Sequence, residues 1–531
     1  FEIRDARIAF MDQASGLFLV APEANLQVAT GAPRSKNVEA HVDAQLEVSG
    51  HRAHVVMAIE LPPGDVPAKG DFTISKFNLR ALGTNAKYFS ALKNVDLNVD
   101  VSGSFEVENG TKLKMLDTGF EASGIINDPR MPGGTMHLKS AHALLRYDGT
   151  TGRVLLDDMS ITSDKINARV MGEGDVIVDR NGVLTQVRGD ISADGLSLNM
   201  PKFLPKPVSF KHVSMRAGYA PSNGQINLER VAISGGPLTL DVAGKIVLPP
   251  QGQSPEIDVQ GSIAAISVSN LLRYWPAGMA PGARDWIQEN ISAGQIGPVD
   301  VKTNIPAGAL DGPSLPNEDV NLTFRMAGIT STYVKGLTPI TNAQGSALLT
   351  GNAFKLDLTS ANVGPLTLSN GHVVIGDLSA EGAVADITAH IDGQVSDVLA
   401  LIDMKPLQYP TRFGIQRQGA VGAAAIDASF KVPTIKDVSV DQVAIDVKGN
   451  LTGLGLSLGE HTQVSQGNLA LNVDNNAMQA TGAVQFYDSK VSLDWKEDFK
   501  TNGPVTSKIA VKGPLDKAAR AALGLDLGRY V

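Results

Sequence analysis

The stretch LEVSG at residues 46–50 carries the pattern that decides the fold of this chain, because apolar residues alternate with other residues and a glycine follows. Alternation with a period of two places apolar side chains on one face of a β-strand and polar side chains on the other. The same pattern returns at residues 99–103, 240–244, 257–261 and 445–449. The sequence therefore predicts a mainly β protein whose half-buried strands end at a glycine.

The composition is that of a folded chain with few aromatic residues in its core. Hydrophobic residues make up 43% and aromatic residues 5% of the 531 positions, so Val, Leu, Ile and Ala supply most of the apolar surface. No run of about 18 apolar residues is present, so no helix is expected to span a bilayer. The chain begins with Phe1 rather than Met, so we expect a piece of a longer protein whose signal or anchor lies upstream.

The sequence offers little support for catalysis, metal binding or nucleic-acid binding. The net charge is −9 and no basic stripe stands out, so nucleic acid is a poor partner. The absence of cysteine excludes disulfides and zinc–thiolate sites. The nine histidines are scattered, and no nucleophile elbow, phosphate loop or dinucleotide fingerprint is present. We expect no enzyme activity and no cofactor.

An internal repeat with an offset of 72 residues organises part of the chain. Nine positions between Tyr147 and Ile191 match nine positions between Tyr219 and Ile263 in residue type, without a gap. Each copy has the pattern of a meander of about four to five strands joined by short turns. Because the spacing drifts elsewhere, a strict short-period solenoid is not favoured.

Three helical inserts are predicted between the strands. They cover 268–275 together with 282–291, then 395–404, then 516–523. Trp275 and Trp286 in the first insert either hold its helices onto the sheet, which we favour, or gate a groove or bind a partner. The expected segments are a β-groove segment at 1–140, β-meander repeats at 141–265, a helical insert at 266–300, a β repeat at 301–394, a short helical insert at 395–410, and a C-terminal β repeat with a terminal helix at 411–531.

The predicted sheet needs a partner for its apolar face, and the helices are too few to cover it. The sheet either folds over on itself as a sandwich or solenoid, or curls into an open groove with an apolar floor. At roughly 25 cal/mol per Å², an empty floor is costly, whereas lipid acyl chains can fill it without needing hydrogen bonds. The residues expected to line such a groove, unless they form an ordinary core, are Val95, Leu97, Val99, Val101, Ile226, Leu228, Leu322, Phe324, Met326, Leu454, Leu456 and Leu458.

One region resembles a known family. The sequences LLRYWP at 271–276 and PGARDWI at 281–287, the GPV that follows at 297–299, and the opening strand at residues 3–8 are similar to the AsmA-like family of Gram-negative envelope proteins. The resemblance is to the YhdP-type members, with TamB as a more distant relative. It covers essentially the whole chain, although only the tryptophan region is moderately specific.

The resemblance implies an elongated, repeating antiparallel β-sheet curled into a hydrophobic groove, a bridge-like lipid-transfer architecture with a few short helices. It also implies a periplasmic protein that is anchored in the inner membrane by a segment outside this chain and moves phospholipid between the inner and outer membranes. The implied partners are phospholipid acyl chains, the inner membrane and other envelope proteins. The alternative is a closed β-solenoid or sandwich, a structural or adhesin-like scaffold without lipid cargo, or less plausibly a polysaccharide-active enzyme.

Overall fold

The computed structural model of the chain is mainly β, with a few short helices. The structure describes residues 1–11, 17–30, 37–85, 92–109, 112–127, 134–178, 184–201, 203–249, 253–380, 382–435, 438–458, 462–500, 507–522 and 524–525. Within these residues, 28 strands belong to one sheet, and every strand pair whose register is known is antiparallel. The prediction of a mainly β, antiparallel fold with few helices is therefore confirmed.

The strands are long, and most of them pair with the strands before and after them in the chain. The first fifteen are β1 (Glu2–Met11), β2 (Phe18–Thr30), β3 (Val38–Val48), β4 (His51–Leu61), β5 (Ala68–Asn78), β6 (Val95–Glu108), β7 (Lys112–Asn127), β8 (Thr135–Asp148), β9 (Arg153–Ser163), β10 (Ile166–Val178), β11 (Leu184–Leu198), β12 (Val208–Ala220), β13 (Gln225–Ser234), β14 (Leu240–Val247) and β15 (Glu256–Ile263). The others are β16 (Ile266–Ser267), β17 (Ile291–Ile305), β18 (Val320–Ser331), β19 (Ile340–Thr350), β20 (Phe354–Val363), β21 (Leu366–Ile375), β22 (Val384–Gln394), β23 (Ile415–Pro433), β24 (Ala444–Leu458), β25 (Thr462–Asp474), β26 (Ala477–Phe486), β27 (Ser489–Asp498) and β28 (Ser507–Lys512).

The helices are short and follow the ends of strands. They are α1 (Leu79–Asn85), α2 (Val268–Tyr274), α3 (Pro281–Asn290), α4 (Val395–Ile402), α5 (Tyr409–Arg412) and α6 (Lys517–Ala522), with the 3-10 turns η2 (Ala309–Asp311), η3 (Asn317–Asp319) and η4 (Val440–Gln442). The predicted inserts correspond to α2, α3, α4 and α6, within two residues where the structure describes their ends; Leu523, the last residue of the third, lies outside the described residues. The sequence did not predict α1 or α5.

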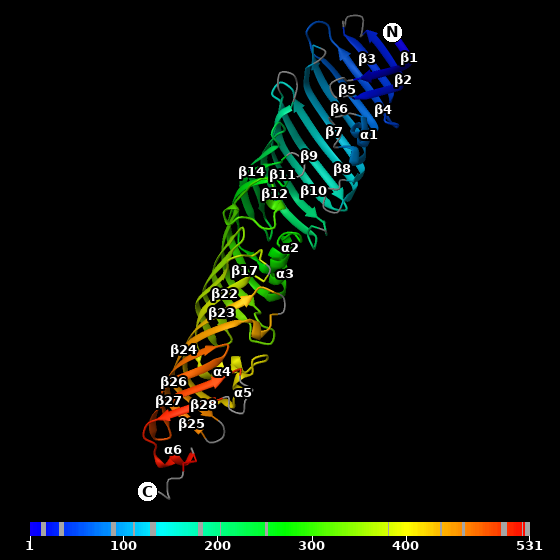
Figure 1. The fold of residues 1–531 in the computed structure, drawn as a ribbon. Helices are drawn as coiled ribbons and strands as arrows, with labels where there is room; N and C mark the ends of the chain where they lie inside the picture. The colour runs from blue at the N-terminus through cyan, green and yellow to red at the C-terminus, as the bar shows by residue number, and fades with distance from the viewer. Residues whose placement is uncertain are drawn as a thin grey trace. The chain divides into compact units, whose positions relative to one another are not determined.

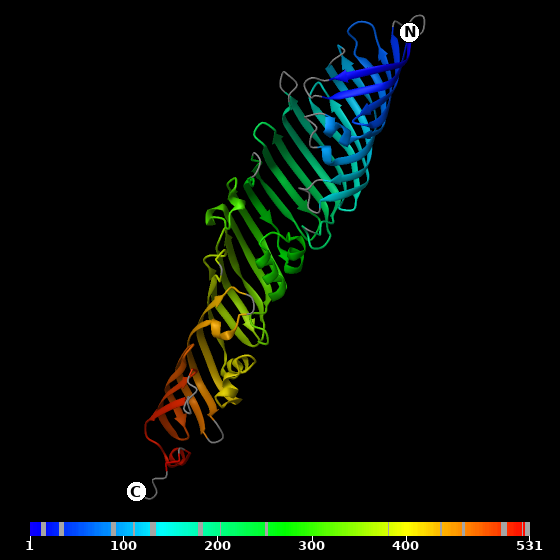
Figure 2. The same cartoon turned by 45° about the vertical axis from the view of Figure 1, so that its right-hand side comes forward.

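The chain divides into two compact units. The first unit contains Phe1–Gly261 and Asn270–Pro281, and the second contains Ser262–Ser269 and Gly282–Val531. Within each unit, Figures 1 and 2 show one layer of strands side by side in chain order, with only short helices against it. The finer division into six segments stays a prediction.

The interpretation that each strand ends at the glycine of its pattern is wrong for most copies. Gly50 lies in a turn, but Gly103, Gly244, Gly261 and Gly449 lie inside β6, β14, β15 and β24. For Gly103, Gly244 and Gly261 the physical reason is close backbone approach, which only a residue without a Cβ permits in the middle of a ladder. An added Cβ would lie 2.2 Å from the carbonyl oxygen of Asp117 at Gly103, and 2.0 Å from the carbonyl oxygen of Asp258 at Gly244.

The two copies of the 72-residue repeat have a β-bulge at the same position. β9 bulges around Asp158 opposite β10, and β13 bulges around Arg230 opposite β14. Asp158 pairs with Arg169 at 3.0 Å, and Arg230 pairs with Asp241 at 2.6 Å. Both members of the second pair come 72 residues after their counterparts (158 to 230 and 169 to 241), with the charges exchanged. The two copies therefore share strand register as well as residue pattern.

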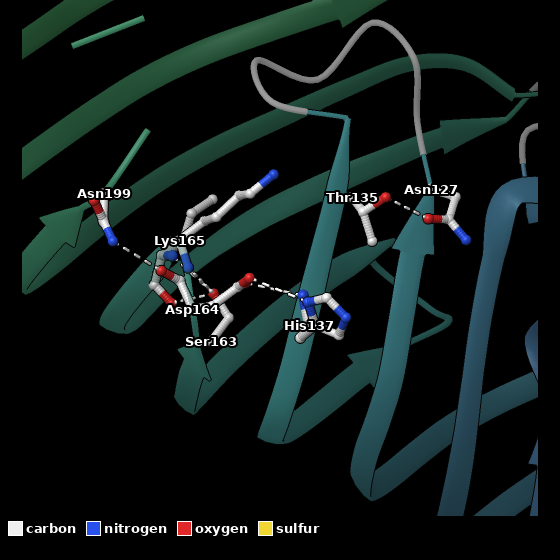
Figure 3. A network of polar contacts seen from close by, with 8 residues as sticks. Asn127, Thr135, His137, Ser163, Asp164, Lys165 and Asn199 are labelled. Carbon is white, nitrogen blue, oxygen red and sulfur yellow. Dashed lines mark hydrogen bonds and ion pairs between the residues drawn. The ribbon is translucent and has the colours of Figure 1, made fainter. Parts of the chain in front are cut away.

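Polar side chains fix the hairpin ends at one edge of the sheet. Figure 3 shows Asp164, in the turn between β9 and β10, facing His137 of β8. Its carboxylate accepts a hydrogen bond from the backbone N–H of His137 at 2.9 Å, and its backbone carbonyl accepts one from the side chain of Asn199 at 3.3 Å. Burial acts to raise the pKa of Asp164, but the hydrogen bonds from His137 outweigh it and lower that pKa. These contacts tie the start of β8 and the end of β11 to the turn between β9 and β10.

Candidate functional site: the apolar face of the sheet

The alternation in the sequence becomes two chemically different faces of the sheet. In β6, Leu97 and Val99 are buried, whereas Asn98 and Asp100, which directly follow them, are exposed. In β27 the alternation runs through all ten residues, with every odd-numbered side chain buried and every even-numbered one exposed. In each strand, one side carries the buried and half-buried apolar side chains, as the side with Leu97 and Val99 does in β6. We call this side of the sheet the apolar face.

Cross-strand pairing continues the apolar face from strand to strand. In the first unit, Val99 lies opposite Ala122 of β7, which lies opposite Ala141 of β8. In the second unit, Phe324 of β18 lies opposite Val299 of β17 and Ala347 of β19. Residues directly opposite each other point to the same side of an antiparallel sheet. The face is therefore a continuous aliphatic surface within each unit, with few aromatic rings.

Short helices cover only parts of this face. In the first unit, Leu79 at the start of α1 packs on the cluster that contains Leu97, Val99 and Leu138. In the second unit, α4 and α6 supply Val395, Leu399 and Ala519 to the largest hydrophobic cluster of the described residues. That cluster is otherwise built by β23–β27, and no residue of β18 belongs to it.

The accessible surface confirms that much of the sheet has no second layer. The chain exposes 30,571 Å². Two compact globular proteins of half its mass would together expose about 22,000 Å². Moving the two units apart could only add exposed surface, so the chain would still exceed this value. It argues against a sandwich, and the antiparallel pairing of neighbouring strands argues against a parallel solenoid.

The predicted lining residues lie on the apolar face but differ in burial. Leu97, Val99, Leu454 and Leu456 are buried in packed clusters. The half-buried members are Val95, Val101, Ile226, Leu228, Leu322, Phe324 and Met326. The side chain of Leu458 lies outside the described residues. The half-buried set, on β6, β13 and β18, keeps part of its apolar surface exposed.

The polar face carries cross-strand ion pairs. Five histidines lie within 3.2 Å of an aspartate: His54, His137, His212, His372 and His390. The hydrogen bond to Asp427, at 2.7 Å, together with the nearby Asp392 carboxylate, raises the pKa of His390. Across the part of the chain that the structure describes, no group of His, Asp and Glu side chains could hold a metal ion.

The two tryptophans of the first insert differ in environment. Trp275, directly after α2, is half-buried and donates a hydrogen bond from its indole nitrogen to the carbonyl of Met279 at 2.6 Å. Its neighbour Tyr274 stacks at a tilt on Phe210 of β12, with ring centroids 5.5 Å apart. Trp286 of α3 is 54% exposed, so most of its surface faces solvent and does not pack against the sheet.

Sequence reasoning missed an aromatic contact in the second unit. Tyr409, the first residue of α5, and Phe413, directly after the helix, both contact Phe499, which follows β27. The signal in the sequence is weak, because a four-residue helix has no periodicity and Phe499 is nearly 90 residues away. The run YPTRF at 409–413, with an aromatic at each end of one helical turn, was the only local indication.

Comparison with known proteins identifies the family. None of the helices that the structure describes is long and apolar enough to cross a membrane. No curated protein and no solved structure matches the chain. A family model described as YhdP protein, an envelope family of Gram-negative bacteria, matches residues 178–519. Because this match covers more than half of the chain, the chain belongs to the YhdP protein family.

Proposed function

We propose that this chain binds phospholipids by their acyl chains along the apolar face of its sheet, and that it forms part of a conduit between the inner and outer membranes. It would work in the periplasm, anchored to the inner membrane by a segment outside this chain. The sheet would curl around the acyl chains as a groove. Family membership and the single-layered antiparallel sheet support this proposal.

The observation that carries the proposal is the row of half-buried side chains on β18. Leu322, Phe324 and Met326 alternate with exposed polar side chains. In the second unit, α4 and α5 contact β22 and β23 and leave this row outside their hydrophobic cluster. An apolar row of this kind loses contact with water when an acyl chain lies on it, which is favourable by roughly 25 cal/mol per Å².

The chemistry of the surface selects the lipid tail rather than a polar ligand. The apolar face is mostly aliphatic and offers few hydrogen-bond donors, so its contacts with a hydrocarbon chain are non-directional. A ligand held in this way can move along the face without breaking hydrogen bonds. Phospholipid headgroups would lie at the strand ends, where turns such as that of Asp164 carry polar groups.

The experiment is native mass spectrometry with lipid extraction on the chain expressed in a bacterial envelope. We expect several phospholipids per chain, and we expect fewer for Phe324→Asp, because a carboxylate on this row repels an acyl chain. Thr323→Asp is the matched control, because residue 323 is exposed on the opposite face of the same strand. Lipid loading should survive that change.

Phe324 of β18 is chosen because it is only half-buried, so a substitution there disturbs packing less than one in a packed core. Leu456 and Val99 are only 7% and 6% exposed, so an aspartate there would disrupt a packed core whether or not lipid binds. A folded wild-type chain without lipid would favour the closed scaffold. Equal lipid loading of the Phe324→Asp and Thr323→Asp variants would contradict the proposed site.

A further inference from the structure

In the second unit, the apolar face of β23–β27 is closed. Leu454 and Leu456 of β24, with Val464 and Leu469 of β25, pack into the large hydrophobic cluster. Their exposed fractions lie between 3% and 7%, so no acyl chain can reach them as the chain stands. The same residues continue the face that is open on β18. The connection between β22 and β23 contributes α4 to this cluster and contacts both of these strands.

This connection leaves and re-enters the sheet at one edge. We call residues 395–414, which contain α4 and α5, the strap. It begins after Gln394 and ends before Ile415, the first residue of β23. Ile415 pairs with Leu458, the last residue of β24, so the strap belongs to the edge where β24 ends and β25 begins.

The strap touches the sheet at the opposite edge. One edge of the sheet contains Ile415. Followed from strand to strand, the same edge contains the hairpin in which Phe486 of β26 pairs with Ser489 of β27. The other end of the same hairpin ladder pairs Ala477 with Asp498, and Phe499 follows immediately. Phe499 therefore lies at the edge opposite to Ile415, and the strap reaches it from across the apolar face.

Three aromatic rings form the crossing contact. The rings of Tyr409 and Phe413 lie 5.4 and 5.7 Å from that of Phe499, centroid to centroid. All three side chains are only half-buried. Nearer its start, the strap is held by Val395 and Leu399 in the cluster and by the hydroxyl of Thr338, which donates to the sulfur of Met404 at 3.3 Å.

The ring contact can open without breaking the sheet. The strap contributes no strand, and the ladder between β26 and β27 is complete without it. Gln408, just before α5, has a positive φ of 52°, and no side chain caps α5 at this residue. The far half of the strap also packs on β23 through the buried Pro410, and the aromatic rings are its contact with the opposite edge.

We propose that the strap is a closure over the apolar face of the second unit, and that it opens at the contact with Phe499 before acyl chains can occupy β23–β27. This inference rests on the proposed function and adds its regulation. The closed strap shields Leu454 and Leu456 from water when lipid is absent. Acyl chains arriving along the face replace the strap's own apolar contacts and keep it open.

The absence of cysteine makes a direct test possible. In the variant Tyr409→Cys with Phe499→Cys, a bismaleimide with a cleavable disulfide spacer joins the strap to the opposite edge, and reduction releases it. Both states are incubated with vesicles of palmitoyl-oleoyl phosphatidylethanolamine, and bound phospholipid is counted by native mass spectrometry. We expect the locked chain to lose part of the lipid that the released chain binds.

Two further variants complete the test. Thr481→Cys with Asp494→Cys, directly opposite each other on β26 and β27 and outside the hydrophobic cluster, is cross-linked as the matched control and should bind the same lipid in both states. Tyr409→Ala with Phe413→Ala removes the ring contact and should bind more lipid than the wild type. Equal binding by the locked and released chains would overturn the closure while leaving the proposed function intact. No lipid on the wild-type or released chain would overturn the proposed function, and the closure with it.

Discussion

At the scale of single residues, glycines inside strands decide how closely neighbouring strands approach. Gly244 of β14 has a φ of +155°, which L side chains rarely adopt, and an added Cβ would lie 2.0 Å from the carbonyl oxygen of Asp258. The neighbouring backbone would have to move to accept a methyl group. Gly236, eight residues earlier, has open space around its Cβ position and an ordinary φ.

We therefore predict that Gly244→Ala destabilises the first unit, by about 1–3 kcal/mol as for other overpacked sites. Gly236→Ala serves as the matched control and should change stability little, because its methyl group meets no neighbour. Urea-induced unfolding followed by circular dichroism measures both. If the two variants unfolded at the same urea concentration, close approach would not be the reason for glycine at 244.

The histidine–aspartate pairs on the polar face make a second residue-scale prediction. His390 lies against Asp427 and Asp392, and Lys448 lies opposite Asp427 on β24. The hydrogen bond to Asp427 comes first among the effects that raise the pKa of His390 in the folded chain. Its stabilising contribution is therefore complete below the unfolded pKa and is lost as pH rises through the higher folded pKa.

The measurement is an NMR titration of the His390 ring. We expect it to titrate above its ordinary value, and Asp427→Asn should lower the midpoint because the acceptor loses its charge. Asp386→Asn is the control, since Asp386 pairs with Lys431 on the same two strands and does not touch His390. An unchanged midpoint in Asp427→Asn would remove Asp427 as the cause.

At the scale of elements, the same alternation serves a packed core in one strand and an open surface in another. Leu493 of β27 is buried in the large cluster, whereas Leu228 of β13 is half-buried. Leu493→Ala should cost about 2–5 kcal/mol, because it leaves a cavity in a packed core. Leu228→Ala should cost clearly less, because part of that side chain already faces water. Urea unfolding of both variants checks this, and equal losses would mean that β13 is as tightly packed as β27.

The sequence predicted strands and most helices because those signals are local. Period-two alternation predicted the β fold, and the prolines around residues 276 and 281 placed α2 and α3. α1 was missed because Gly83 and Thr84 weaken its helical pattern, and α5 was missed because one turn has no periodicity.

Burial was harder to predict than secondary structure. Leu456 and Phe324 both occupy apolar positions of alternating strands, yet Leu456 is buried in the cluster that α4 joins and Phe324 is half-buried. The difference lies in which distant segment covers each strand. Alternation cannot report that, so the sequence could define the face but could not separate its open part from its closed part.

At the scale of the whole molecule, strands with a packed hydrophobic core and strands without one occur in the same chain. Backbone hydrogen bonds hold every ladder, but only β23–β27 add a large packed core within the described residues. Local opening costs less where few buried apolar contacts must be broken. Stability should therefore be uneven along the chain even though its secondary structure is uniform, and a ligand of the apolar face should stabilise the uncovered strands most.

Hydrogen exchange measured by mass spectrometry tests this expectation. Without lipid, peptides from β24–β27 should exchange slowest, and peptides from β12–β14 and β18 should exchange faster. Vesicles of phosphatidylethanolamine should slow exchange in the second group, because acyl chains on the apolar face raise the cost of opening those strands. Glycerophosphoethanolamine, which carries the headgroup without acyl chains, should leave it unchanged. Protection by this headgroup compound would place the contact at the polar strand ends instead, because only the hydrocarbon chains can exploit an aliphatic surface.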